Sequence, residues 1–222
     1  SSSLQLAEML TSKTIGWGAA DAAAADLWYA STEGGGVYVS RDDAQSWEVA
    51  AGSLISDDGR AIAIDATASG VAYVATSTGV LATDDAGRTW TERNQGLPAT
   101  GVQDVGVDGE DPARLLAATA DGLFRSTDRG LSWSQVSSGL PAEASFHSVA
   151  TSIDRPQLWY AGGIGSVFRS SDGGATWDEI GSDLPAVPIL EIAFHPSIPT
   201  RVLVATAGRG VWTAGQACGD AV

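Results

Sequence analysis

Four tryptophans recur along this chain at an almost constant interval, and the interval limits the folds that the chain can adopt. The spacings are 43, 43 and 44 residues, measured between Trp47, Trp90, Trp133 and Trp177. Each tryptophan ends a segment of the pattern Ser/Thr-x-Asp-x-Gly-x-Ser/Thr-Trp, with the aspartates Asp42, Asp85, Asp128 and Asp172. The one clear lapse is Ala44, in the glycine position of the first segment. Such a period is the signature of a repeat architecture.

Each period reads as four short strands. In the third unit, the β-prone runs are residues 102–107, 114–119, 123–126 and 133–136, separated by turns rich in Gly, Pro and Asp. Such runs are typical of strands rather than helices. A four-stranded repeat of about 43 residues has the size of one β-propeller blade. The sequence therefore predicts an all-β chain made of blades.

The repeated motif has a structural interpretation. Its aspartate can accept hydrogen bonds from the backbone of a tight turn, and glycine permits the positive φ that such a turn needs. Its tryptophan can bury a large surface between neighbouring sheets. Each turn offers one repeated acid, whereas calcium needs several oxygen ligands, so no metal ion is expected there.

The segments Gly-Leu-Phe-Arg-Ser-Thr-Asp-Arg-Gly-Leu-Ser-Trp (122–133) and Gly-Arg-Gly-Val-Trp (208–212) carry a family resemblance. The pattern resembles the Asp-box, or BNR, repeat of sialidases, sortilin-type receptors, xyloglucan-degrading enzymes and photosystem II assembly factors. The resemblance covers roughly residues 13–215 and is greatest to the assembly-factor and sortilin-like branch. It implies a β-propeller, and it favours a secreted or periplasmic location. It implies no particular activity, because the motif holds blades together in proteins of many functions.

Counting the units predicts a single propeller of five blades over residues 1–222. The expected units are 13–55, 56–99, 100–142, 143–187 and 188–222. The fifth unit stops before any motif and lacks a fourth strand, so we expect residues 1–12, through the run 4–10, to complete it and to close the ring. Such pairing would leave no long unpaired edge. The alternative is a fragment of a ring with six to eight blades.

Composition excludes several classes of function. Twelve basic residues against 27 acidic ones argue against binding nucleic acid or an anionic membrane through general electrostatics. No apolar run is long enough for a membrane-spanning helix. The single cysteine, Cys218, excludes an internal disulfide framework and a cysteine-based zinc site. No cofactor is expected.

The spacing of the repeat also predicts a candidate binding site in the central channel. A leucine recurs with the period of the tryptophans, at Leu54, Leu97, Leu140 and Leu184. Seven residues after the last three of these leucines, in the innermost strands of three consecutive units, lie Asp104, His147 and Glu191, whereas the position after Leu54 holds Ala61. Equivalent positions surround the channel at one depth, so these residues are candidates for a shared site; the alternative is a polar, water-filled channel. The rim that carries the loops between blades adds Arg60, Phe146 and Arg209, together with Glu33, Asp121 and Trp17. Phe146 and Trp17 are the candidate exposed aromatics there.

We assign no catalytic residue. A sialidase-like site needs an arginine triad and a tyrosine nucleophile. The four tyrosines of this chain lie in segments predicted to be strands, and Arg125 and Arg169 occupy the same strand position in two repeats. The expected function is therefore a non-catalytic binding or scaffold propeller for a protein or carbohydrate partner, acting as a monomer. The alternatives are a small glycoside hydrolase or lyase that uses channel carboxylates, or a repeat fragment of a larger surface protein.

Overall fold

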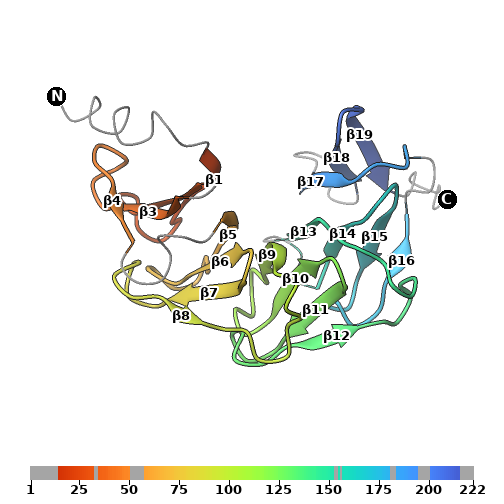
Figure 1. The fold of residues 1–222 in the computed structure, drawn as a ribbon, viewed down its shortest axis with the longest axis horizontal. Coiled ribbons are helices and arrows are strands. Elements are labelled where there is room, and N and C mark those ends of the chain that lie inside the picture. The colour runs from red at the N-terminus through yellow and green to blue at the C-terminus, as the bar shows by residue number, and fades with distance from the viewer. Residues whose placement is uncertain are drawn as a thin grey trace.

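Five antiparallel β-sheets follow one another along the chain. The structure is a computed structural model, and it describes residues 15–32, 35–50, 58–152, 155, 157–180, 184–194 and 201–215. In these residues the regular structure is β-strand throughout. Figure 1 shows the sheets side by side in chain order along an arc, with the first strand of each sheet on the inner side. This is the all-β propeller architecture that the repeat predicted.

The first three blades have four strands each. Blade one contains β1 (Ile15–Ala20), β2 (Trp28–Thr32), β3 (Gly36–Ser40) and β4 (Glu48–Val49). Blade two contains β5 (Gly59–Ile64), β6 (Ala72–Thr76), β7 (Gly79–Thr83) and β8 (Thr91–Glu92). Blade three contains β9 (Val102–Val107), β10 (Leu115–Thr119), β11 (Gly122–Ser126) and β12 (Ser134–Val136). The strands predicted for this third unit are thus confirmed to within one residue at each end.

The last two blades differ in strand number. Blade four contains β13 (Ser148–Thr151), β14 (Trp159–Gly162), β15 (Val167–Ser170) and β16 (Asp178–Glu179). Blade five has three described strands, β17 (Ile189–Phe194), β18 (Arg201–Thr206) and β19 (Gly210–Gly215). The predicted partner for its free edge, residues 4–10, lies outside the described residues, as does Cys218. Blades one and five stand at the two ends of the arc in Figure 1, so closure of the ring by the chain ends stays a prediction.

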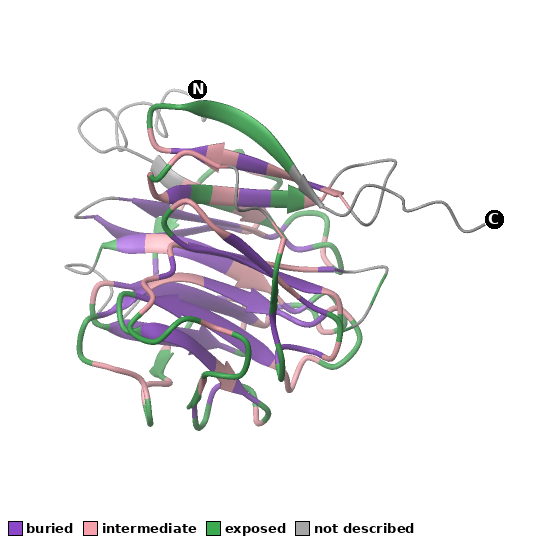
Figure 2. Cartoon of the chain, turned by 90° about the vertical axis from the view of Figure 1, so that its right-hand side faces the viewer, coloured by how far each residue is buried: buried purple, intermediate pink, exposed green. Residues whose placement is uncertain are grey.

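The core lies between consecutive blades. One apolar cluster joins blades one and two through residues such as Tyr29, Val39 and Val74, and another joins blades two and three around Trp133. Two further clusters join blade three to four and blade four to five. The middle strands are buried on both faces, and Figure 2 shows them in purple between exposed green turns. Apolar burial between sheets is therefore what stacks the blades.

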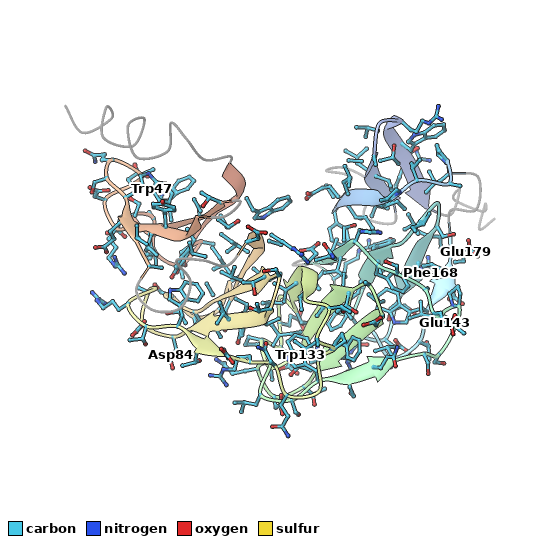
Figure 3. All side chains as sticks on the ribbon, viewed as in Figure 1. Trp47, Asp84, Trp133, Glu143, Phe168 and Glu179 are labelled. Carbon is cyan, nitrogen blue, oxygen red and sulfur yellow. The ribbon has the colours of Figure 1, made fainter. Side chains whose placement is uncertain are left out.

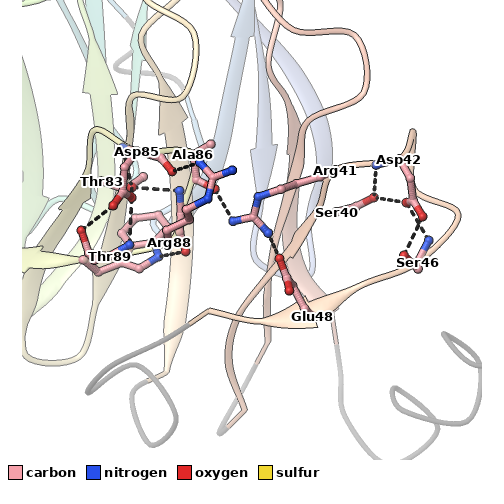
Figure 4. Close-up of polar contacts among 12 residues, drawn as sticks. Ser40, Arg41, Asp42, Ser46, Glu48, Thr83, Asp85, Ala86, Arg88 and Thr89 are labelled. Atoms are coloured by element: carbon pink, nitrogen blue, oxygen red, sulfur yellow. Dashed lines mark hydrogen bonds and ion pairs between the residues drawn. The ribbon is translucent and has the colours of Figure 1, made fainter.

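The four repeated motifs form one type of turn with one hydrogen-bond pattern. In the third blade, the Ser126 hydroxyl donates to Asp128 Oδ1 at 2.7 Å and accepts the Gly130 N–H at 2.8 Å. The Ser132 N–H donates to Asp128 Oδ1 at 2.9 Å, and the Ser132 hydroxyl donates to Oδ2 at 2.6 Å. Asp42, Asp85 and Asp172 make the same contacts, and Figure 4 shows those of Asp42 and Asp85. Below, these are called the motif turns.

The tryptophans after the motif turns are buried to different extents. Trp133 and Trp177 are 6% and 3% exposed, whereas Trp47 and Trp90 are half-buried. Trp133 packs toward blade two, and its indole N–H donates to the Arg93 carbonyl of that blade at 2.8 Å. Trp47 belongs to blade one, where the described chain supplies no preceding blade to cover the ring. Trp90 follows blade one and is still half-buried, so full burial is seen only for Trp133 and Trp177 among these four tryptophans.

The alanine in the first motif turn gives a test of backbone strain. Ala44 has φ +60°, whereas the equivalent Gly130 has φ +78°. The left-handed region costs an L-residue about 1–2 kcal/mol relative to glycine. We expect Ala44→Gly to raise the free energy of unfolding by about 0.5–1 kcal/mol in urea denaturation, since part of that gain is offset by unfolded-chain entropy.

The matched control is Gly130→Ala. A methyl group there would meet Trp133 Cζ2 at 3.4 Å in a left-handed backbone, so this change should lower the free energy of unfolding by about 1–2 kcal/mol. If both substitutions shift stability in the same direction, the strain argument is wrong.

Candidate functional site

The inner strands carry a repeated bulge that directs side chains toward the axis. In β1, β5, β9 and β17 one residue is skipped in the pairing with the next strand, and these residues are Gly16, Arg60, Gln103 and Leu190. A bulge bends its strand and changes where the following side chains point. The residues directly after the bulges are Trp17, Ala61, Asp104 and Glu191. The bulge therefore recurs at the equivalent place in four of the five blades, and the pairing of β13 with β14 in blade four shows none.

Three of these four side chains line a hollow of about 220 Å³ beside the inner strands. They are Trp17, Asp104 and Glu191, from blades one, three and five. Below, this is called the axial hollow. The axial hollow brings together the carboxylates of Asp104 and Glu191, which the repeat spacing predicted as channel residues. It adds the ring of Trp17 from blade one, where the spacing predicted no channel residue.

Asp104 connects two blades. Its Oδ1 accepts the Val105 N–H at 2.8 Å, and its Oδ2 accepts the Val149 N–H of β13 at 2.8 Å. Burial raises the pKa of Asp104 to about 7, the two N–H donors oppose that rise, and the nearby Glu191 carboxylate adds to it. Both oxygens thus hold backbone groups, and the carboxyl retains protons close to neutral pH.

The other channel candidates behave differently. Burial raises the pKa of Glu191 and lowers the pKa of His147, which favours the neutral imidazole. His147 is half-buried, lies just before β13, and is not among the residues that line the axial hollow. The structure therefore brings Asp104 and Glu191 together and leaves His147 outside their hollow.

One rim prediction was wrong. Phe146 was expected as an exposed aromatic, but it is 1% exposed and packs edge-to-face against Phe168, with ring centroids 5.7 Å apart. Its backbone N–H donates to the Thr119 carbonyl of blade three at 2.9 Å, and its ring lies in the apolar cluster between blades three and four. It therefore cannot stack on a ligand at the surface.

The described rim candidates other than Phe146 and Trp17 are not part of the axial hollow. Arg60 donates to the Val102 carbonyl of the next blade at 3.3 Å, and Arg209 is exposed in the turn between β18 and β19. Asp121 is exposed and accepts the Thr100 hydroxyl at 2.9 Å. Glu33 lies outside the described residues. Arg60, Arg209 and Asp121 therefore do not form one site with the channel carboxylates, whereas Trp17, also expected at the rim, lines the axial hollow with them.

Sequence analysis missed a second row of acids. Asp21, Asp65 and Asp108 are 2%, 0% and 1% exposed, and each follows the inner strand of its blade. Asp21 accepts the Gly70 N–H of blade two at 2.8 Å, and Asp108 accepts the Trp159 indole N–H of blade four at 3.2 Å. The signal that could have revealed them is their spacing of 44 and 43 residues (21 to 65, 65 to 108). These acids join blades, so they are structural.

The two rims of the blades differ in character. The motif rim carries the motif turns and this second row of acids; the entry rim carries the loops that lead into the inner strands. On the entry rim, Ile164 and Leu190 are 55% and 57% exposed. The loops beneath them are joined, because the Gly165 N–H bonds the Val187 carbonyl and the Ile189 N–H bonds the Gly163 carbonyl, each at 3.0 Å. Two large apolar side chains therefore stand on one connected piece of backbone.

The described ranges hold neither a metal-binding cluster nor a membrane-spanning helix. Those ranges hold no group of three or more His, Cys, Asp or Glu residues suited to a metal ion. Among the same residues there is no helix of the length and apolarity needed to cross a membrane.

Comparison with protein families identifies the repeat. The model of the family described as Photosynthesis system II assembly factor YCF48 matches residues 2–204. The chain belongs to this family. No curated protein matches the sequence.

Solved structures share the fold at low sequence identity. A GH74 xyloglucanase from Xanthomonas campestris is 21% identical with a TM-score of 0.74, and the match covers 90% of this chain and 36% of that one. An extracellular domain from B. thetaiotaomicron is 16% identical with a TM-score of 0.72, covering 91% of this chain and 26% of the other. A chain of the COPII outer coat on membranes is 10% identical with a TM-score of 0.73, over 94% and 60% of the two chains. The chain thus spans about a third of the xyloglucanase.

The motif turns make folding depend on pH at the acidic end. The Thr89 backbone N–H and hydroxyl lower the pKa of Asp85 to about 2, and the Ser132 hydroxyl lowers the pKa of Asp128 below its ordinary 3.8. A lowered folded-state pKa contributes stability that is present above the ordinary value and is lost as pH falls through the folded one. Asp104 has the opposite sign, because its raised pKa gives stability that is lost as pH rises toward 7.

We therefore expect the free energy of unfolding of Asp128→Asn to fall less steeply than that of the unaltered protein as pH drops below the ordinary pKa of 3.8. The amide keeps the shape of the carboxylate but carries no titrating proton. The measurement is urea unfolding at several pH values, with Asp121→Asn as the control on the entry rim. Equal slopes for Asp128→Asn and the unaltered protein would contradict the assignment.

Proposed function

We propose that this chain is a non-catalytic binding propeller that engages a protein partner through the entry rim of blades four and five. The observation that carries the proposal is the pair of exposed apolar side chains there, Ile164 and Leu190, at 55% and 57% exposure. Large exposed apolar groups on rigid loops are typical of interaction surfaces. The family description supports a protein partner, because an assembly factor acts on other proteins.

The roles of the acids also favour binding over catalysis. The motif-turn carboxylates are occupied by their own turns, and Asp21 and Asp108 are occupied by contacts between blades. Asp104 has a backbone N–H on each oxygen, which is a poor arrangement for a nucleophile that must attack a substrate. The architecture therefore explains the acids of the motif turns and of the second row, together with Asp104.

Site-specific photocrosslinking tests this proposal. A photoreactive amino acid is placed at Ile164 and, as a matched control, at Leu131, which is 57% exposed in a motif turn on the other rim. In cells of the source organism we expect a discrete protein adduct from position 164 and none from position 131. No adduct at 164, or the same adducts at both positions, would contradict a binding surface at the entry rim.

The axial hollow supports a second candidate function, a carbohydrate-binding or hydrolytic site. The favouring observation is that Trp17 lines the hollow with two carboxyls whose pKa values are raised, to about 7 for Asp104. An aromatic ring with a proton-retaining carboxyl suits sugar binding and general acid catalysis.

Calorimetry with a panel of oligosaccharides and divalent metal ions tests this second candidate. If the axial hollow is a working site, Glu191→Gln should abolish a heat that the unaltered protein gives, without loss of thermal stability. Asp104→Ala is the harsher variant, because it also removes the contact with Val149. The absence of heat from every ligand would remove this candidate.

A further inference from the structure

A second hollow lies on the entry rim of blade four, next to the surface proposed for binding. It has a volume of about 260 Å³ and is lined by Pro141, Glu143, Ala144, Phe146, Ile164 and Phe168, with a few small neighbours. These residues come from the loop that leads into β13, from the hairpin between β14 and β15, and, for Phe168, from β15 itself. Below, it is called the rim hollow.

The floor of the rim hollow is preformed. Phe146 and Phe168 are 1% and 3% exposed and meet at an interplanar angle of 69°. The Phe146 N–H is held by the Thr119 carbonyl, and the hairpin is closed by a bond from the Gly163 N–H to the Ser166 carbonyl at 3.0 Å. Both rings are already packed beneath the hollow, so a group that enters it has no aromatic side chain to order, which lowers the entropic cost of binding.

The flank of the rim hollow is acidic. Glu143 is exposed and is held in a tight turn at φ +60°, while Glu179 accepts the hydroxyl of Ser166, a residue of the hollow, at 2.9 Å. Figure 3 shows Glu143, Phe168 and Glu179 on the same side of the molecule. The lining contains no Lys, Arg or His, and the chain carries a net charge of −15. The charge at the hollow therefore favours a cationic neighbour.

We propose that the rim hollow receives one large apolar side chain from a segment of a protein partner whose adjacent residues are basic. Its volume is below the roughly 300–1,000 Å³ of small-molecule sites and suits a single side chain. The mainly apolar lining gives the affinity by burial. The two flanking carboxylates select basic neighbours and repel acidic ones. This inference rests on the proposed function and specifies the partner's chemistry.

Short synthetic peptides test the inference directly. The probe is a peptide with a central Phe flanked by Lys, compared with an Ala-centred peptide and a Phe-centred peptide flanked by Glu. Binding to the full chain is followed by NMR titration of backbone amides. We expect saturable shifts at residues 143–146 and 163–168, and binding weaker by at least about tenfold for each comparison peptide, from lost apolar burial or from charge repulsion.

Variants locate the site. Ile164→Glu should weaken the Lys-flanked peptide by about tenfold, since it places a charge against the apolar side chain. Glu143→Gln and Glu179→Gln should each weaken it by about threefold, the size of an exposed ion pair, and should reduce its dependence on salt. Leu131→Glu, on the motif rim, should leave binding unchanged. All four positions are exposed, so these variants should keep the fold.

The result that overturns the inference is specific to it. Absence of saturable shifts, equal binding of the Glu-flanked peptide, or equal loss in Leu131→Glu would each reject the rim hollow as a site for a basic segment. The proposed function fails separately, through the crosslinking at position 164. A discrete adduct there whose crosslinked segment lacks basic residues would keep the proposed function and reject this inference.

Discussion

The carboxylate of each motif turn determines where the following tryptophan goes, and the stacking of blades depends on that direction. In blade three, Asp128 holds the backbone and hydroxyl of Ser132, the residue directly before Trp133. Trp133 then donates its backbone N–H to Gln95 and its indole N–H to Arg93, each at 2.8 Å, both in the blade before. Trp177 makes the corresponding backbone bond to Ser138 at 3.1 Å. One local turn thus fixes both its own hairpin and the neighbouring blade.

The second row of acids strengthens the same rim. Asp21 and Asp108 bond the next blade along the chain, and Asp65 lies 3.8 Å from the Arg129 guanidinium of the next blade. Their carboxylates are buried, so the contacts are shielded from salt and from competing water. Together with the motif turns, they make the motif rim the structural one. The entry rim, with its bulges and the exposed Ile164 and Leu190, is the surface that we propose for recognition.

The sequence predicted the fold much better than the site. A period of 43 residues determines strand order and length, because each strand must reappear at the same place in every blade. Side-chain orientation is less predictable: the repeat spacing placed Phe146 at the rim, but its ring packs inward against Phe168 in the cluster between blades three and four. The repeat spacing correctly grouped Asp104 with Glu191. It did not reveal the bulges in the inner strands that directly precede these two residues. Asp21 and Asp108 escaped notice because aspartate is common in turns for local reasons.

The acidic composition has a different meaning once these contacts are known. From the sequence, 27 acidic residues against 12 basic ones described an anionic surface that disfavours polyanions. In the structure, the four motif-turn acids accept backbone and hydroxyl donors, and the second row is buried between blades. These acids contribute to the fold through geometry rather than through their long-range field. The charges that remain available for recognition are those beside an unfilled apolar surface, and Glu143 and Glu179 occupy such a place at the rim hollow. Recognition by this propeller is therefore expected to depend on a few rim residues, while the acids of the motif turns and of the second row hold the blades together.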